Sequence, residues 1–228
     1  AAVVDGRTVY QNLRKAIAFL LPVNGGESMT ILISALLARD LPILSLQVLW
    51  LNMINSLTMT VPLAFEPKFK GIMGQSPRHP KEPLITRKLL HRIVFVSLFN
   101  WVLIFGMFEW AKFTTGDVAV ARTMAIQSLV ACRIIYLLSI SQLGISLLNR
   151  LRRKSTSIAN APFLLLGIGG AVILQIAFSQ LSIMNILFDT APLTWNQWLI
   201  CLIPMVPMVP WAILANVIDP AQKSAPKQ

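Results

Sequence analysis

Six apolar segments leave this chain few ways to fold. Each is close to the roughly 20 residues that a helix needs to cross a bilayer. They cover residues 14–38, 43–65, 89–111, 119–142, 161–182 and 195–217. The chain is 55% hydrophobic and 13% charged, with a mean hydropathy of +0.67, whereas a soluble domain carries about 25% charged residues. The sequence therefore predicts an all-α, polytopic membrane bundle of six transmembrane helices, forming a single domain over residues 1–228.

The basic residues predict how this bundle is oriented. Sixteen lysines and arginines lie in the first, third, fifth and last aqueous segments, against three in the alternate loops. Since positive charge accumulates on the cytoplasmic side, both termini are expected there, in a multi-pass protein of the cell membrane. The net charge of +11 does not indicate nucleic-acid binding, because the charges are confined to the segments between apolar spans.

Several local patterns refine this picture. The segment 66–88, rich in proline and basic residues, predicts a cytoplasmic loop, and "ARDLP" (38–42) predicts a tight hairpin between the first two spans. "PMVPMVP" (204–210) is expected to break or kink the last helix. Cys132 and Cys201 fall inside apolar spans, where packing is their expected role. The chain opens on Ala1 without a signal-peptide pattern, which suggests a piece of a longer protein or a processed chain.

Polar residues at membrane depth are the candidate functional groups. Asn24 and Glu27 lie one helical turn apart in the first span. Asn52, Asn55 and Ser56 follow the i, i+3, i+4 spacing of one helix face in the second span. A carboxylate at the bilayer centre costs roughly 2.5–3.5 kcal/mol on insertion scales, and the predicted hairpin would bring the two polar faces together.

These oxygen-bearing side chains would suit a hard cation that has lost its water. If the ion is a metal, Glu27 and Asn52 are its expected ligands. Pro22 with Gly25 and Gly26, and Pro62 in the second span, would loosen the backbone and free carbonyl groups as further ligands. The alternative is that the polar groups only hold the bundle together through interhelical hydrogen bonds.

Arg133 is a cation deep in the fourth span. It is expected either to pair with Glu27 as an internal counter-ion or to line a separate aqueous cavity. The sequence leaves both alternatives open.

Several separated motifs resemble the membrane half of P-type cation-transporting ATPases, in the calcium-pump-like class. They are "GRTVYQNLRKAIAFLLPVNGGE" (6–27), "QVLWLNMIN" (47–55), "LAFEP" (63–67) and "MGQSPRHPKEPLI" (73–85). The resemblance implies the fifth to tenth helices of such a pump. It implies cation ligands at Asn24 and Glu27 on the fifth helix and at Asn52 on the sixth.

The chain departs from the family's pattern at other ligand positions. Asn55 and Ser56 stand where the family has a threonine and an aspartate, and Arg133 stands where calcium pumps have a glutamate. "NSLTM" (55–59) replaces the usual "DGLP" break. The resemblance, with these departures, therefore implies one ion per cycle, calcium-like or a proton, or proton export with Arg133 as the internal counter-ion, or a pump that has lost ordinary transport.

The motif "DKTGT", which carries the family's phosphorylated aspartate, is missing from this sequence. The chain is therefore expected not to hydrolyse ATP alone and to need no cofactor of its own. ATP and Mg²⁺ are expected only for the parent translocase. Its expected partners are the lipid bilayer, the transported cation, and the pump's first four helices and cytoplasmic domains. The alternatives are a free-standing six-helix permease and a non-catalytic membrane subunit.

Overall fold

The computed structural model describes residues 2–68, 73, 85–151 and 161–220. Its regular elements are all helical, which confirms the predicted all-α class. The long helices are α1 (Ala2–Leu36), α4 (Arg87–Thr115), α5 (Val118–Ile140), α7 (Pro162–Gln180) and α10 (Met205–Ile218). The short ones are α2 (Ser45–Ile54), α3 (Val61–Ala64), α6 (Gln142–Leu151), α8 (Ser182–Phe188) and α9 (Trp195–Leu202), with one π-helical turn, η1 (Asn55–Thr60).

Five helical segments of the described chain are long and apolar enough to cross a membrane. They are Val3–Leu36, Arg87–Thr115, Val118–Ile140, Pro162–Gln180 and Trp195–Ile218. The remaining predicted span, residues 43–65, is divided into α2, η1 and α3. The reason is a local change of hydrogen bonding, because the Val61 N–H donates to the Ser56 carbonyl five residues back, and Pro62 has no N–H to donate.

The predicted break of the last helix is confirmed. α9 ends at Leu202 and α10 begins at Met205, with Pro204 between them at the start of the second helix. A proline removes a hydrogen-bond donor, and Pro204 is tolerated at the start of α10 because the first residues of a helix have no carbonyl to donate to.

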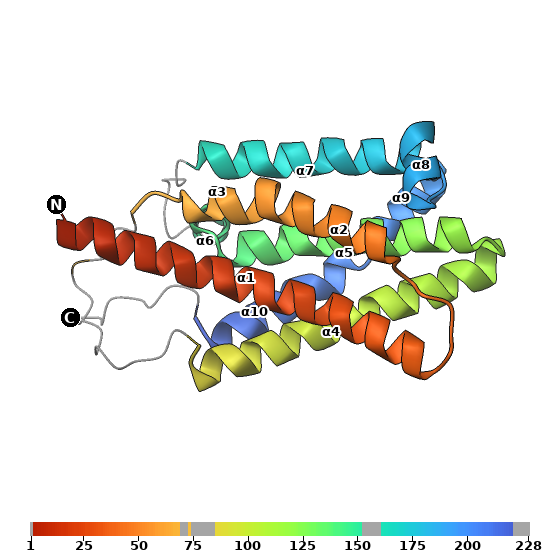
Figure 1. The fold of residues 1–228 in the computed structure, drawn as a ribbon. Helices are drawn as coiled ribbons and strands as arrows, with labels where there is room; N and C mark the ends of the chain where they lie inside the picture. Colours follow the sequence, from red (N-terminus) through yellow and green to blue (C-terminus); the bar gives the residue numbers. More distant parts are fainter. Residues whose placement is uncertain (1, 69–72, 74–84, 152–160, 221–228) are drawn as a thin grey trace.

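The bundle is built around α5, which is buried along most of its length (Figure 1). α1 packs along α4, and α7 lies over η1 and α3. The start of α1 and the end of α10 lie at the same end of the bundle (Figure 1), where the Arg14 Nη2 atom is 2.6 Å from the Asp219 Oδ1 atom.

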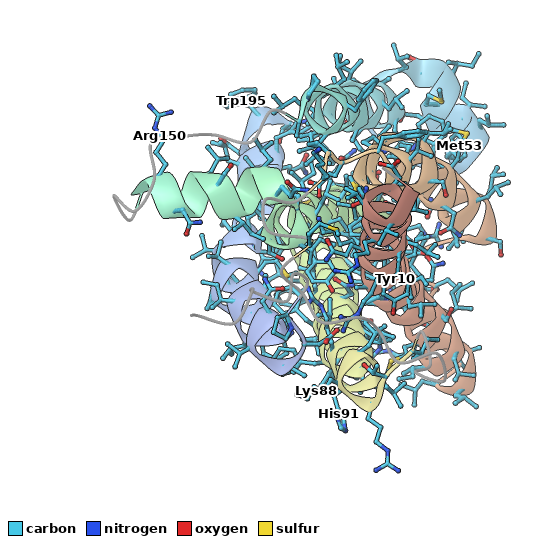
Figure 2. All side chains as sticks on the ribbon, turned by 90° about the vertical axis from the view of Figure 1, so that its left-hand side faces the viewer. Tyr10, Met53, Lys88, His91, Arg150 and Trp195 are labelled. Atoms are coloured by element: carbon cyan, nitrogen blue, oxygen red, sulfur yellow. The ribbon has the colours of Figure 1, made fainter. Side chains whose placement is uncertain are left out.

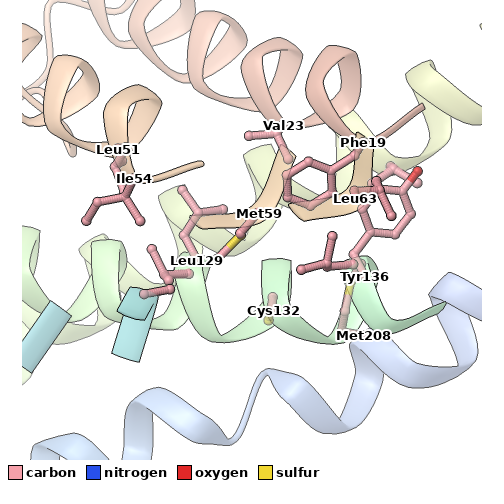
Figure 3. Packing of buried hydrophobic residues seen from close by; sticks show 14 of the residues in the cluster. Phe19, Val23, Leu51, Ile54, Met59, Leu63, Leu129, Cys132, Tyr136 and Met208 are labelled. Atoms are coloured by element: carbon pink, nitrogen blue, oxygen red, sulfur yellow. The ribbon is translucent and has the colours of Figure 1, made fainter. Parts of the chain in front are cut away.

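Apolar side chains fill the centre of the bundle and also cover its outside. Phe19 and Val23 of α1 pack with Met59 of η1, and Cys132 of α5 lies in the same cluster (Figure 3). Leu166 and Ile173 of α7 are among many exposed apolar side chains. An exterior with this many exposed apolar side chains suits lipid or other helices, which fits a multi-pass integral membrane protein.

One end of the bundle carries polar helix ends. Viewed from that end, α6 runs sideways from the bundle with Arg150 at its far end, and Lys88 and His91 project from the first turns of α4 (Figure 2). Part of the predicted loop 66–88 also belongs here, although residues 69–72 and 74–84 lie outside the described residues.

Candidate functional site

Glu27 and Arg133 form an ion pair inside the bundle. The Arg133 Nη2 atom lies 2.5 Å from the Glu27 Oε1 atom, and the two residues are 1% and 2% exposed. Of the two alternatives predicted for Arg133, the structure shows the ion pair with Glu27. The Nε and Nη1 atoms of Arg133 have no hydrogen-bond partner among the described residues, so the guanidinium has donors to spare beside a single carboxylate.

The other candidate ligands differ in exposure. Asn55 is buried in η1, which contacts α1, whereas Asn52 is half-buried. Asn24 and Ser56 are exposed on the outside of the described chain. The structure therefore brings Glu27 and Asn55 into the interior, and it leaves Asn24 and Ser56 at its surface.

The π-helical turn begins at Asn55. In such a turn each N–H donates five residues back, which widens the helix and redirects its side chains, and these turns occur frequently at functional sites. Asn55 is 0% exposed, and neither its Nδ2 nor its Oδ1 atom has a partner among the residues that the structure describes. The turn occupies the segment where the resembling pumps have their "DGLP" break.

The glycine pair of α1 serves packing, and α1 continues through it without interruption. A Cβ atom on Gly26 would lie 2.5 Å from the Asn100 Cβ atom, and one on Gly25 would lie 2.3 Å from the Ser97 Oγ atom. Ser97 and Asn100 of α4 both donate hydrogen bonds to the Pro22 carbonyl. The predicted loosening of α1 at this point is therefore wrong: small residues allow α4 to approach closely instead.

Pro22 does free one carbonyl, and Tyr136 binds it. Because proline has no N–H, the Ala18 carbonyl four residues earlier lacks its usual helical donor. The Tyr136 hydroxyl donates to this carbonyl oxygen at 2.8 Å and accepts from Arg92 Nε at 2.9 Å. A side chain of α5 thus replaces the missing backbone donor of α1.

We expect Tyr136→Phe to lower the free energy of unfolding by about 1–3 kcal/mol, because the Ala18 carbonyl and the Arg92 Nε would both lose their partner. Thermal unfolding of the purified protein in detergent measures this. Ser139→Ala is the control, since the half-buried Ser139 hydroxyl donates only to a carbonyl of its own helix. Equal unfolding midpoints for the two variants would contradict the expected role of Tyr136.

Two further clusters of buried charged side chains lie at the end of the bundle that holds the start of α1 and the end of α10. Lys15 Nζ is 2.6 Å from Glu66 Oε2, and the other oxygen of this carboxylate accepts the Gln142 backbone N–H at 2.9 Å. Arg92 is completely buried and donates from Nη1 to the Asp219 carbonyl at 2.5 Å. Sequence reasoning counted Lys15, Arg92 and Glu66 as groups of the aqueous segments, because their positions near span ends gave no sign of burial.

The opposite end carries ion pairs that are closer to solvent. Arg122 Nη1 is 2.6 Å from Asp189 Oδ2, and Lys112 pairs with Asp40 in the loop between α1 and α2. The hydrogen bond and charge of Lys112 lower the pKa of the Asp40 carboxyl below its usual value. This pair is therefore present at neutral pH, and its contribution is lost only as the pH falls through that lowered pKa.

Similarity to known proteins shows the family of this chain. Residues 40–218 match the sequence family described as cation transporting ATPase, C-terminus. The chain belongs to this family. The predicted resemblance to P-type cation-transporting ATPases is thereby confirmed, and the chain corresponds to the C-terminal membrane region of this family.

Three related cation-transporting ATPases illustrate the match. Identity is 73% over 220 residues to the cation-transporting ATPase pma1 of Synechocystis sp., which covers 96% of this chain and 24% of that protein. Identity is 37% over 198 residues to the probable cation-transporting ATPase F of Mycobacterium tuberculosis, which covers 87% of this chain and 21% of that protein. Identity is 28% over 207 residues to the calcium-transporting ATPase of Bacillus subtilis, which covers 89% of this chain and 22% of that protein. The chain spans about a quarter of the length of these relatives.

The family match covers α2 to α10, whereas Glu27 and its helix α1 lie before its first residue. Arg133, Asn52, Asn55 and Ser56 fall inside the matched part. The ion pair therefore joins a helix outside the matched range of the cation-transporting ATPase family to one inside it.

Proposed function

We propose that this chain forms the membrane ion pathway of a P-type cation pump, with Glu27 as its central acidic ligand. The supporting observation is the buried carboxylate of Glu27, on a helix that contacts the amide-bearing π-helical turn η1. Asn52, Asn55 and Ser56 would add amide and hydroxyl oxygens, and Asn24 would add one from α1. Oxygen ligands of this kind suit a hard cation such as calcium, and a metal ion would be held first by Glu27 and Asn52.

Arg133 acts in this proposal as an internal counter-ion. Its guanidinium neutralises the carboxylate of Glu27, so a cation that binds must compete with a charge already in place. The site then carries one cation per cycle, which is calcium-like or a proton. When the cation leaves, the guanidinium returns to the carboxylate, so that neither charge is buried without a partner.

The proposal includes a topology of six membrane crossings with both termini in the cytoplasm of a cell-membrane protein. The composite of α2, η1 and α3 runs from Ser45 to Ala64, and 20 helical residues span about 30 Å. The exposed Asn24 and Ser56 would face helices of the pump outside this chain. ATP and Mg²⁺ would bind in cytoplasmic domains that also lie outside it.

The full-length pump in lipid nanodiscs tests the proposal. We expect its phosphorylation by ATP to require one particular cation, with one ion carried per phosphate, when calcium, sodium, potassium and protons are compared. Phosphorylation that is equally strong without any of these ions, or a stoichiometry of two ions per phosphate, would contradict the proposed site.

A free-standing permease or a non-catalytic subunit would need no phosphorylation motif. The codons preceding Ala1 separate these alternatives from the pump, because an open frame encoding "DKTGT" supports the pump. Ion flux through liposomes that contain this chain alone would support the permease.

A further inference from the structure

Two amide side chains, on facing helices, are buried without protein partners. Asn55 of η1 is 0% exposed and Gln175 of α7 is 3% exposed. None of their four amide nitrogen and oxygen atoms has a hydrogen-bond partner among the described residues. An amide cannot remove its polarity by gaining or losing a proton, so burial without any partner would be strongly unfavourable.

The packing of the two segments places these amides near each other. A Cβ atom on Gly167 would lie 2.1 Å from the Thr58 carbonyl oxygen, and the Trp50 and Phe178 rings stack with centroids 5.6 Å apart. The two segments run antiparallel, so Asn55 and Gln175 both lie between these contacts. With a rise of about 1.5 Å per residue, counting from either contact puts the two amides about 3–8 Å apart along the bundle.

A third amide comes from α5. Gln127 is buried, and its Nε2 atom donates to the Gln175 backbone carbonyl at 2.9 Å. Gln127 lies six residues before Arg133, which is about 9 Å along the helix. The three amides therefore form one polar layer shared by η1, α5 and α7. Along the bundle, this layer lies close to the Glu27–Arg133 pair.

The missing partners must be small. Asn55 and Gln175 are already enclosed by this chain's own helices, so neither lipid nor other parts of a longer pump can reach them. The unpartnered groups include two NH₂ donors and two oxygen acceptors, which a bare cation cannot satisfy together. Water both donates and accepts, and a buried water makes about three hydrogen bonds to groups of this kind.

We propose that Asn55, Gln127 and Gln175 form a hydration site in the membrane core that holds ordered water. Trp50, Phe178 and Phe188 close it towards α8, with ring centroids 5.2–5.6 Å apart. Asn55 would belong to both this site and the cation site. A water bound there could solvate the cation as it leaves Glu27, a consequence that rests on the proposed function, whereas the hydration site itself does not.

Cryo-electron microscopy of the full-length pump, at a resolution that shows ordered water, tests the site directly. We expect density within hydrogen-bond distance of the Asn55 and Gln175 amides, and we expect it to be lost in Gln175→Met, which keeps the side-chain volume. A direct bond between the two amides with no density between them would overturn the proposal.

Thermal unfolding provides a second measurement that does not depend on transport. We expect Gln175→Met to lower the unfolding midpoint by about 2–4 °C, and Asn55→Leu combined with Gln175→Met to recover at least half of this loss, since no unpaired amide remains. The control is Gln180→Leu on the same helix, whose exposed side chain donates to the Leu193 carbonyl. A higher midpoint for Gln175→Met would show that the amide has no partner and would overturn the hydration site.

Discussion

Glu27→Gln in the full-length pump is expected to abolish cation-dependent phosphorylation. The variant removes the only acidic group within hydrogen-bond distance of Arg133 in the described chain, and an amide cannot attract a cation in competition with that guanidinium. It also leaves a buried cation unpaired, which costs about 3–5 kcal/mol of stability. Phosphorylation from ATP and thermal unfolding are measured on the same preparation.

A double variant separates transport from stability. Glu27→Gln combined with Arg133→Met removes both charges, and a neutral, well-packed pair is often as stable as the buried ion pair that it replaces. We expect the double variant to regain stability but not cation-dependent phosphorylation. The control is Glu109→Gln, which loses only a surface pair with Arg39 at 3.5 Å and should change both measurements little. Cation dependence that survives in the double variant would contradict the role proposed for Glu27.

Gly167→Ala is expected to disrupt the contact between α7 and η1. The added Cβ atom would lie 2.1 Å from the Thr58 carbonyl oxygen and 2.7 Å from the Pro62 Cγ atom. A backbone oxygen and a proline ring cannot move aside as a flexible side chain does, so α7 must shift as a whole. Overpacking of this kind costs about 1–3 kcal/mol or more, and thermal unfolding in nanodiscs measures the loss.

Gly169 on the same helix provides the matched control. A Cβ atom there would meet no atom within 4 Å in the described structure, and alanine is a better helix former than glycine by about 1 kcal/mol. Gly169→Ala should therefore be neutral or stabilising. If both alanine variants behaved alike, close packing at Gly167 would not be what holds α7 on η1.

Much of the fold could be predicted from hydropathy and proline positions. Long apolar segments gave the all-helical class, and Pro204 marked the interruption of the last span. In the segment "GIGGA" (167–171) the structure places a close helix contact at Gly167 and not at Gly169. Sequence spacing alone could not separate the two glycines, because the face that a helix presents depends on its neighbours.

The site was harder to predict, for two physical reasons. A π-helical turn such as η1 has no periodic pattern of its own, so the exposure of Asn55 and Ser56 could not follow from regular i, i+3, i+4 spacing. Long basic side chains near span ends can reach either water or a buried carboxylate, so Lys15 and Arg92 looked like loop charges. Arg133 could be predicted as a buried cation because it lies too deep in its span to reach water. The assignment of cation ligands stays a prediction.

The two side-chain links between α1 and α5 have a mechanical consequence. Tyr136 is fastened to the Ala18 carbonyl and Arg133 to Glu27, and these attachment points on α1 are nine residues, about 13 Å, apart. One link would act as a pivot, but two at different heights resist both sliding and rotation. While the Glu27–Arg133 pair is closed, rocking of α1 would therefore carry α5 along with it, and a cation that displaces Arg133 from Glu27 would release one of the two links.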